Sequence, residues 1–412
     1  MTKNPFETYI VEGGHHRVEG WIEEGALSML TAINAYQRNR GIEGSVAEIG
    51  VHHGRSFIAL AAMRQSHEFA VAVDIFEHQE LNPDHSGRGN SAAFAKNLES
   101  FGVADRVAVL TRDSLTLRPG EIAAAAHGRP VRMFSVDGSH TAEHTLNDLK
   151  LAEEALAPAG VVVLDDWCNP DWPGVQEGLF AFIDSGTTLL PFAYGNYKLL
   201  LAPRAVYQEY FGCVAEWIKP RAEHYREVML CGTTCHYLLL PSPKELVPIA
   251  AACGAAVLDV RNPSGPAGML GQGWGDSEPW GRWTVGPEAE FTILPPPGSG
   301  LRLELMGFVA SLPAGTGPAQ VVTLIGAGGP LGEWVIDNEE LAWYRAPIEP
   351  PPPSSPGSPP GPVTIRLSLS ATRSPKSLGL SDDARELGIR AGRFVLGWSQ
   401  LAQTQPAGRL DL

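Results

Sequence analysis

The stretch Glu48-Ile49-Gly50-Val51-His52-His53-Gly54-Arg55-Ser56 joins a short apolar run to a helix-like segment, and it decides the fold. Two glycines flank its turn, and the free N–H groups at the start of the next helix favour an anionic or carboxylate-bearing ligand. A dinucleotide-binding loop has the pattern G-x-G-x-x-G, in which the middle glycine lets the backbone approach a pyrophosphate. Because His52 holds that position, the loop suits a ligand that needs less close approach. An ordinary structural turn is the alternative.

Outward from this loop, apolar runs alternate with helix-like stretches. The runs are rich in Val, Ile or Phe and cover 45–50, 69–74, 106–111, 131–137 and 160–165. The helix-like stretches cover 55–64, 91–101, 121–126, 142–156 and 174–184. This alternation predicts an α/β fold, a parallel sheet with helices on both faces. Two further runs, 187–192 and 196–201, are separated by Ala193-Tyr194-Gly195 and predict a hairpin. The expected sheet is therefore mostly parallel and seven-stranded, with an antiparallel last strand.

The composition of the 412-residue chain changes after residue 245. All 12 histidines precede that point, whereas six of the 10 tryptophans follow it together with a single lysine, Lys376. Fifteen acidic and 11 basic residues follow it, so −11 of the net charge of −15 belongs to the first part. Short alternating runs between Gly- and Pro-rich turns then predict a β-sandwich. We expect an α/β domain over 1–245 and an all-β sandwich over 250–412, with a proline-rich loop at 347–362.

The charge balance and the sequence pattern exclude several partners. A net charge of −15 gives no electrostatic footprint for nucleic acid or an anionic membrane. No apolar run approaches the roughly 20 residues of a membrane-spanning helix, and the first residues lack the layout of a signal peptide. Five cysteines without a second pair to complete a zinc site favour free thiols in a reducing compartment. The expectation is a cytoplasmic protein without a membrane span or a nucleic-acid partner, and a homo-oligomer is compatible with it.

Acidic residues stand at the predicted carboxyl ends of the strands, where open α/β sheets bind ligands. Asp74 ends the second strand, and its two acceptor oxygens suit the hydroxyls of a ribose. Asp113 and Ser114 follow the third strand, where they would contact the exocyclic amine of a purine. A solvated loop acid is the alternative for each one taken singly. Together with the glycine loop, in this order, they predict a nucleoside site.

The fourth and fifth strands end in Asp137 and in the pair Asp165-Asp166. Three carboxylates at neighbouring strand ends repel one another unless a cation neutralises them, and oxygen ligands suit Mg²⁺, Mn²⁺ or Ca²⁺ rather than zinc. Capping of the following helices is the alternative. His140 lies beside this cluster, where it would act as a general base or simply hold Asp137 by a hydrogen bond.

These residues resemble those of class I S-adenosylmethionine-dependent methyltransferases, and specifically the metal-dependent sugar O-methyltransferases related to macrocin O-methyltransferase. The resemblance begins at about Val18, in the lead-in Glu19-Gly20-Trp21, and extends to about residue 205. The matching motifs are Glu48-Ile49-Gly50 through Gly54-Arg55-Ser56, Asp74, Asp113-Ser114, Asp137-Gly138-Ser139-His140, Ala157-Pro158-Ala159-Gly160, Asp165-Asp166 and the terminal hairpin. Ala159 stands where the family often has a second glycine.

The resemblance implies a Rossmann-like fold and a role for each matching position. Glu48, Gly50, Gly54 and Ser56 would form the pocket for the methionine part of S-adenosylmethionine, with Asp137 at its border. Asp74 would hold the ribose, and Asp113 with Ser114 would border the adenine. The residues that match the family's Mg²⁺ ligands, which also accept Mn²⁺, are Asp137, Asp165 and Asp166. The general base is either Asp137 or His140.

The function that the resemblance implies is S-adenosylmethionine-dependent, divalent-metal-assisted O-methylation of a hydroxyl on a sugar or glycoside, in a polysaccharide or a secondary metabolite. Two alternatives stay open: a catalytically inactive Rossmann-like protein that binds carbohydrate, and a metal-independent methyltransferase that acts on a small molecule. Segments 273–284 and 374–383 are similar to parts of accessory β-sandwich modules of bacterial polysaccharide-modifying enzymes. Tryptophan and arginine side chains near a concave sheet would stack on sugar rings, and the alternative is that the aromatic residues only anchor the core and the turns.

Overall fold

The computed structural model describes residues 4–250, 253–262, 267–298, 302–312, 319–349, 360–399 and 407–410. The chain divides into two compact units. The first unit comprises Met1–Asn34 and Ile42–Ala250, and the second comprises Ala35–Gly41 and Ala251–Leu412. None of the helices in the described ranges has the length and apolar character needed to cross a lipid bilayer.

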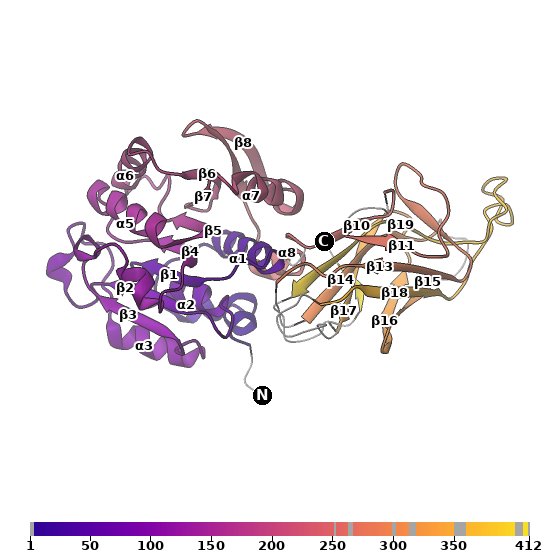
Figure 1. Cartoon of the computed structure of the whole chain (residues 1–412), viewed down its shortest axis with the longest axis horizontal. Coiled ribbons are helices and arrows are strands. Elements are labelled where there is room, and N and C mark those ends of the chain that lie inside the picture. Colours follow the sequence, from indigo (N-terminus) through magenta and orange to yellow (C-terminus); the bar gives the residue numbers. More distant parts are fainter. Residues whose placement is uncertain are drawn as a thin grey trace. The chain divides into compact units, whose positions relative to one another are not determined.

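The first unit is built on a nine-stranded sheet with the order β3-β2-β1-β4-β5-β7-β6-β9-β8 (Figure 1). The first five strands in this order are parallel, and β7 is antiparallel to both of its neighbours. This arrangement confirms the predicted mostly parallel sheet with an antiparallel strand near its end. The strands are β1 (Ser45–Ile49), β2 (Ala70–Asp74), β3 (Val107–Thr111), β4 (Val131–Val136), β5 (Leu156–Leu164), β6 (Leu189–Gly195), β7 (Lys198–Pro203), β8 (His224–Leu230) and β9 (Thr233–Leu239).

The sheet has two strands more than the sequence predicts. Strand β9 pairs in parallel with β6 through Ala193 and Tyr194, and β8 completes an antiparallel hairpin on its outer side. The turn of this hairpin is made by Cys231 and Gly232, both with positive φ angles. Such a pair of left-handed residues matches the twist of antiparallel strands, so the short turn Cys231-Gly232 is sufficient to form the hairpin.

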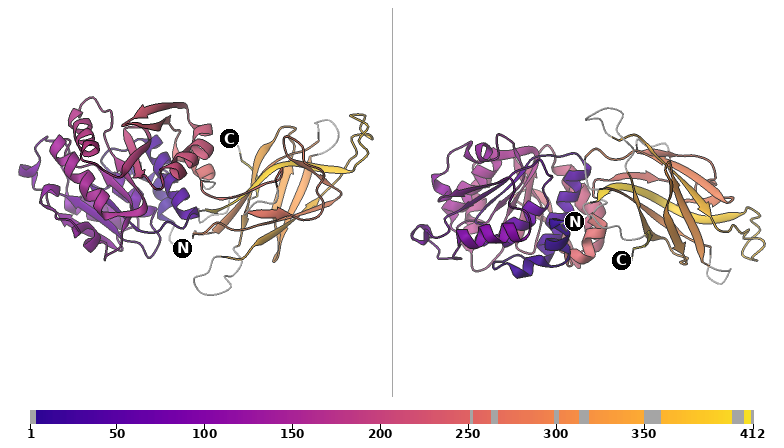
Figure 2. Two further views of the ribbon diagram at one scale, coloured as in Figure 1. Left: turned by 45° about the horizontal axis from the view of Figure 1, so that its top comes forward. Right: turned by 90° about the horizontal axis from the view of Figure 1, so that it is seen from below.

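Helices cover both sides of this sheet, as Figure 2 shows. Successive side chains of a strand point to opposite faces, so Ala47 and Ile49 of β1 face one layer and Val46 and Glu48 the other. The first layer is a buried apolar cluster that includes residues of α4, α5 and α6. The helices are α1 (Glu24–Asn39), α2 (Arg55–Ala62), α3 (Ser91–Ser100), α4 (Glu121–Ala125), α5 (Ala142–Ala155), α6 (Pro173–Asp184), α7 (Tyr207–Cys213) and α8 (Pro243–Ala250), with short η1 (Glu7–Val11), η2 (Gly14–Arg17), η3 (Gln79–Leu81), η4 (Ser114–Thr116), η5 (Val214–Ile218) and η6 (Lys219–Arg221).

The register of the parallel strands brings their carboxyl ends level. Ile49 of β1 pairs with Val73 of β2 and with Val136 of β4, and Val136 in turn pairs with Leu164 of β5. The residues that directly follow these positions therefore lie along one edge of the sheet. They are Gly50, Asp74, Asp137 and Asp165.

The hairpin between β6 and β7 turns later than predicted. The sequence places its turn at Ala193-Tyr194-Gly195, which is wrong, because these three residues belong to β6. The turn is made by Asn196 and Tyr197, with φ angles of 49° and 60°. Ala193 and Tyr194 stay in the strand since they also pair with β9. The later turn places Tyr197 and Lys198 at the carboxyl edge of the neighbouring β5.

The second unit is a pair of antiparallel sheets around one core, as predicted for a β-sandwich (Figure 2). One sheet has the order β10-β19-β14-β17-β20, with β12 also on β19, and the other has the order β11-β13-β18-β15-β16. The strands are β10 (Ala256–Asp259), β11 (Gly268–Leu270), β12 (Arg282–Val285), β13 (Glu288–Ile293), β14 (Arg302–Ala310), β15 (Gln320–Gly326), β16 (Gly329–Ile336), β17 (Ala342–Ile348), β18 (Val363–Leu369), β19 (Leu387–Ser399) and β20 (Gly408–Arg409).

The proline-rich loop predicted at 347–362 begins too early. Pro347 pairs with Glu304 and Ile348 with Leu303, so both belong to β17. Residues 350–359 of the predicted loop lie outside the described residues. Among the tryptophans of this unit, Trp334 is fully buried and its ring N–H donates to the Arg345 carbonyl oxygen. Its role is therefore to anchor the core of this unit.

Candidate active site

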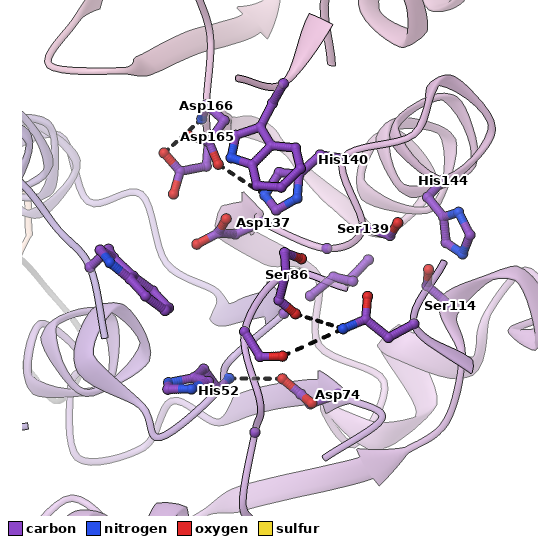
Figure 3. A pocket seen from close by; sticks show the side chains of 18 of the residues that line it. His52, Asp74, Ser86, Ser114, Asp137, Ser139, His140, His144, Asp165 and Asp166 are labelled. Carbon is purple, nitrogen blue, oxygen red and sulfur yellow. Dashed lines mark hydrogen bonds and ion pairs between the residues drawn. The ribbon is translucent and has the colours of Figure 1, made fainter. Parts of the chain in front are cut away.

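A pocket of about 530 Å³ opens at the carboxyl edge of the sheet in the first unit. Its walls come from the ends of β1, β2, β4 and β5, from the loop after β2, from the β6–β7 turn and from the lead-in before α1. Figure 3 shows His52 and Asp74 at one end of this pocket and His140, Asp165 and Asp166 at the other, with Asp137 between them. The pocket is therefore acidic at both ends.

The loop after β1 approaches the loop after β4 very closely. Gly50 has a φ of +85°, and a Cβ at this position would lie 1.7 Å from the carbonyl oxygen of Asp137. Only glycine fits there, because both the left-handed conformation and the contact exclude a side chain. The same loop lets the backbone N–H of His52 donate to Asp74 Oδ2 at 2.8 Å.

Replacing Gly50 by Ala is expected to destabilise the first unit by about 3 kcal/mol or more, since a left-handed alanine and a steric overlap with Asp137 add together. Gly120 is the matched control. It has the same φ of +85° but nothing within 4 Å of the point that an alanine methyl group would occupy. Gly120→Ala should therefore cost only the conformational part, about 1 kcal/mol. Urea denaturation of both variants measures the difference, and equal losses would contradict the close approach.

Asp74 is held by backbone groups on both of its oxygens. Oδ2 accepts from His52 N–H, and Oδ1 accepts from Phe76 N–H at 2.6 Å. Burial raises the pKa of this carboxyl, and the two backbone hydrogen bonds work against that rise. Each oxygen has a further lone pair, so the carboxylate can still accept hydrogen bonds from a diol. The carboxylate is thus fixed in place and suited to a ribose.

Asp113 and Ser114 border the pocket on a third side. Asp113 Oδ1 accepts from the Leu115 N–H at 2.9 Å and lies 3.5 Å from His144 Nε2. The Ser114 carbonyl oxygen accepts from Asn147 Nδ2 at 3.1 Å. His144 therefore contacts Asp113, the residue predicted to border a purine, and not the acidic cluster around Asp137.

His140 bridges two carboxylates. Its Nδ1 lies 2.9 Å from Asp84 Oδ2, and its Nε2 lies 2.9 Å from Asp166 Oδ2. The indole of Trp172 stacks on the imidazole with the ring centroids 4.1 Å apart. Asp166 is fixed on its other oxygen by Asn169 Nδ2 at 2.6 Å. His140 thus orients Asp166, one of the predicted metal ligands, by contact with its Oδ2.

The charge of His140 follows from these contacts. Burial opposes its protonation, but the hydrogen bonds with Asp166 and Asp84 outweigh burial and raise the pKa of His140 to about 9. Although burial favours the neutral form of Asp84, its hydrogen bonds with His140 and Ser86 hold its pKa well below the usual range. At neutral pH the imidazole is therefore a cation with both nitrogens engaged. A general base needs a free lone pair, so Asp137 is the better of the two candidates in this arrangement.

Replacing His140 by Gln should make the stability of the first unit less dependent on pH. The folded pKa of about 9 lies above the ordinary value of 6.5, so the stabilisation is fully present below pH 6.5 and is lost as the pH rises through 9. The loss in the variant should be about 3 kcal/mol below pH 6.5 and should shrink toward zero at the alkaline end. Denaturation across this pH range, in chelator, measures it, and a constant difference would contradict the double ion pair.

Asp165 is engaged by a buried cation. The ammonium of Lys198 forms an ion pair with Asp165 Oδ2, and the lysine side chain is only 3% exposed. Burial opposes the charge of Lys198, but Asp165 and Asp137 more than offset it and raise the pKa of the ammonium. Burial and the neighbouring Asp165 raise the pKa of Asp137 well above its ordinary value. Lys198 therefore partly neutralises the acidic cluster.

The residues fit a divalent cation at one end of the pocket. Ligand atoms of Asp137, His140 and Asp166 lie within 4.8 Å of one another, and the carboxylates supply the oxygen donors that Mg²⁺ and Mn²⁺ prefer. Asp165, the third predicted ligand, lies beside them but is paired with Lys198. The structure thus brings the three predicted aspartates together, but it pairs one of them, Asp165, with Lys198.

The predicted cofactor residues fall into two groups. Five of them line the pocket: Gly50, Asp74, Asp113, Ser114 and Asp137. The other three lie behind its wall: Glu48, Gly54 and Ser56. Glu48 is fully buried, and neither of its oxygens has a hydrogen bond of good geometry. Burial raises the pKa of Glu48 to about 7, and the nearby hydroxyls of Ser56 and Ser135 work against that rise.

Sequence reasoning missed three contributors to the site. Lys198 had a visible signal, a single lysine within the apolar run Tyr197-Lys198-Leu199-Leu200-Leu201. Asp84 lies in a loop and Trp172 precedes a helix, and neither belongs to a recognisable pattern. Both are brought to His140 only by the fold.

A comparison with protein families identifies the first unit. Residues 47–167 match a family model described as a methyltransferase domain. This match covers β1 through the end of β5, the segment that supplies most of the pocket. It confirms the class of enzyme predicted from the sequence at the level of a methyltransferase.

Solved structures show more distant likenesses. The O-methyltransferase NovP is 14% identical, with a TM-score of 0.34 over 42% of this chain and 78% of that chain. TomG, an O-methyltransferase from Streptomyces achromogenes, is 20% identical, with a TM-score of 0.32 over 49% and 90%. CalS11, a TDP-rhamnose 3′-O-methyltransferase, is 19% identical, with a TM-score of 0.32 over 42% and 78%. At these values the likenesses carry no argument about substrate. No curated protein matches the chain.

Proposed function

We propose that this protein transfers the methyl group of S-adenosylmethionine to a hydroxyl of a sugar or glycoside, assisted by a divalent cation held by Asp137 and Asp166. The observation that carries the proposal is the division of the pocket. Asp74, a hydrogen-bond acceptor for a ribose, lies at one end of the pocket, and His140 and Asp166 lie at the other, with Asp137 between them (Figure 3). A donor and an acceptor molecule would therefore meet near Asp137.

The chain's own residues supply binding, orientation and a base. S-adenosylmethionine, when bound, supplies an electrophilic methyl group, and the cation, when bound, supplies stabilisation of negative charge on the acceptor oxygen. Without a cation, burial and Asp165 raise the pKa of Asp137 and favour its protonated form, whereas a bound cation would favour the carboxylate that a base needs. His140 and Asn169 hold Asp166 in one orientation throughout. Positioning of this kind supplies much of the rate when the donor is already activated.

Aromatic side chains support a sugar as the acceptor. Trp21 is 72% exposed and Tyr197 is 48% exposed, and both line the pocket. An exposed ring beside carboxylates offers an apolar face for the C–H side of a sugar and acceptors for its hydroxyls.

Transfer of labelled methyl from S-adenosylmethionine to a panel of nucleotide sugars, glycosides and oligosaccharides tests the proposal. Each acceptor is assayed with Mg²⁺ and with chelator, and calorimetry measures cofactor binding separately. We expect cofactor binding without an acceptor and methyl transfer to at least one sugar hydroxyl that falls in chelator. Cofactor binding with transfer only to acceptors that are not sugars would overturn the substrate class.

One observation favours a second candidate, a methyltransferase that needs no metal. Lys198 already places a cation beside Asp165 and Asp137, so the site has a resident positive charge. A fixed ammonium can stabilise developing negative charge on an acceptor oxygen, although less strongly than a divalent ion. Transfer at an unchanged rate in chelator would establish this candidate in place of the first.

A further inference from the structure

A second group of metal-ligating side chains lies in the lead-in, outside the acidic pocket. It consists of His15 and His16, both in η2, and Glu24, at the start of α1, and we refer to it as the lead-in cluster. Glu24 Oε1 lies 3.1 Å from His16 Nε2 and 4.0 Å from His15 Nε2. Tetrahedral zinc with bonds of about 2.0–2.1 Å separates its ligand atoms by roughly 3.3 Å. The two distances from Glu24 are therefore close to those of a zinc site, and all three atoms lie within 4.8 Å of one another.

The ring of His15 is already buried and oriented as metal-binding histidines are. The residue is only 1% exposed, and its Nδ1 lies 3.1 Å from the carbonyl oxygen of Tyr9. A carbonyl can only accept, so Nδ1 carries the proton and Nε2 carries a lone pair. This Nε2 is buried and makes no hydrogen bond, and it faces Glu24. Metal-ligating histidines commonly donate their other ring N–H to a backbone carbonyl, as His15 does.

We propose that His15 Nε2, His16 Nε2 and Glu24 Oε1 bind a transition-metal ion of the zinc type, in a site separate from the acidic pocket. Two imidazoles and one carboxylate favour zinc over Mg²⁺, which takes oxygen ligands. The ion has a route to the site because the side chains of His16 and Glu24 are 56% and 44% exposed. Solvent would complete the coordination on that side.

Binding would require one local change. His16 Nε2 now hydrogen-bonds to Glu24, and His16 Nδ1 lies 3.5 Å from Arg55 Nη2. A metal on Nε2 moves the ring proton to Nδ1, where it would face the Arg55 guanidinium. Because the His16 side chain is more than half exposed, a small rotation gives that proton to water, and Arg55 keeps its 2.8 Å bond to the Gly20 carbonyl oxygen.

The position of the cluster links it to the active-site wall. Its ligands stand on both sides of residues 17–23, and three residues at the end of the span from His16 to Glu24 line the pocket: Trp21, Ile22 and Glu23. A metal that joins η2 to α1 would close this span into a loop and restrict its motion. The bound ion would thus order the wall that carries the exposed Trp21 without touching the reacting groups.

A neighbouring cluster offers a matched comparison. His53 Nδ1 lies 3.4 Å from Glu19 Oε2, and His52 contributes a third ligand atom within 4.8 Å. Glu19 is 77% exposed, and the His53 nitrogen that faces it is Nδ1, whereas the buried nitrogens of this set without a hydrogen bond are His52 Nδ1 and His53 Nε2. His67 and Glu43 form an exposed pair at 3.6 Å that has only one histidine. These two sets serve as controls for the lead-in cluster.

The test is calorimetric titration of the full chain with Zn²⁺ after chelator treatment, in excess Mg²⁺ so that the acidic pocket is saturated. We expect one tight equivalent of Zn²⁺ for the wild type, for His53→Ala and for His67→Ala. His16→Ala and Glu24→Gln, which alter partly exposed side chains, should weaken this equivalent by more than about 100-fold. Circular dichroism verifies that both variants are folded.

Asp137→Asn separates this proposal from the proposed function, since it should lose methyl transfer and keep the zinc equivalent. Unchanged zinc binding in both His16→Ala and Glu24→Gln would overturn the lead-in site. Loss of the equivalent in His53→Ala would assign it to the neighbouring cluster instead. The absence of any tight equivalent in the wild type would also overturn the proposal, whether or not the enzyme transfers methyl groups.

Discussion

Replacing Asp137 by Asn is expected to lower kcat/KM for methyl transfer by about 10²- to 10⁴-fold, the range of a lost general base. Asn keeps the shape of the side chain but cannot take a proton, and it is a weaker ligand for a cation. Burial and the neighbouring Asp165 raise the pKa of Asp137, so its carboxylate binds a proton more readily than an ordinary aspartate does. Radiolabelled methyl transfer measures kcat/KM, and calorimetry should show S-adenosylmethionine binding changed by less than tenfold.

Asp171 provides the control for this experiment. It lines the same pocket but is exposed to solvent, and its loss changes the net charge equally. An exposed charge is screened by salt, so Asp171→Asn should alter kcat/KM by less than about tenfold. Equal losses in the two variants would mean that the pocket needs negative charge in general and that Asp137 has no special role as a base.

Replacing Lys198 by Met is expected to lower the free energy of unfolding of the first unit by about 3–5 kcal/mol. Met has a similar volume, so the change removes the ammonium while leaving the packing largely intact. Asp165 then loses its ion-pair partner, and Asp137 and Glu48 lose a nearby positive charge. Urea denaturation followed by hydrogen exchange of β5 and β7 amides reports on the first unit alone.

The double variant Lys198→Met with Asp165→Asn distinguishes an unpaired charge from a packing defect. If the cost of Lys198→Met comes from a stranded carboxylate, then neutralising Asp165 should restore part of the lost stability. Asp165→Asn by itself should be destabilising because it strands the ammonium. A double variant no more stable than Lys198→Met would show that the ion pair is not the cause.

The strand-helix alternation could be predicted because each of the first five strands is a compact apolar run. Val46, Val71 and Val162 lie in such runs, and each is fully buried in the sheet. The register then follows from the fold class, which is why Asp74, Asp137 and Asp165 could be assigned to one edge from the sequence alone. Two expectations failed: the β6–β7 turn is made by Asn196 and Tyr197, neither of which is glycine or proline, and β8 and β9 extend the predicted seven-stranded sheet.

The chemistry of the site was harder to predict than its position. Whether His140 is a base or a cation depends on Asp84, a loop residue 56 positions away, and no periodic pattern relates the two. Likewise Asp165 cannot be recognised as an ion-pair partner until β7 places Lys198 against β5. Sequence patterns report which element a residue belongs to, whereas proton affinity depends on neighbours that tertiary packing selects.

The interior position of β1, between β2 and β4, has a consequence for how the protein folds. β1 pairs with β4 through Ser45 and Val131, and β5 pairs with β7 through Val163 and Leu200. The sheet is therefore held together by pairings between residues that are far apart in the sequence. Topologies dominated by such contacts fold slowly, because loop closure precedes the gain from pairing. A nascent chain cannot complete the pocket until Lys198 has left the ribosome. Cofactor affinity should therefore appear late in refolding, after most secondary structure has formed.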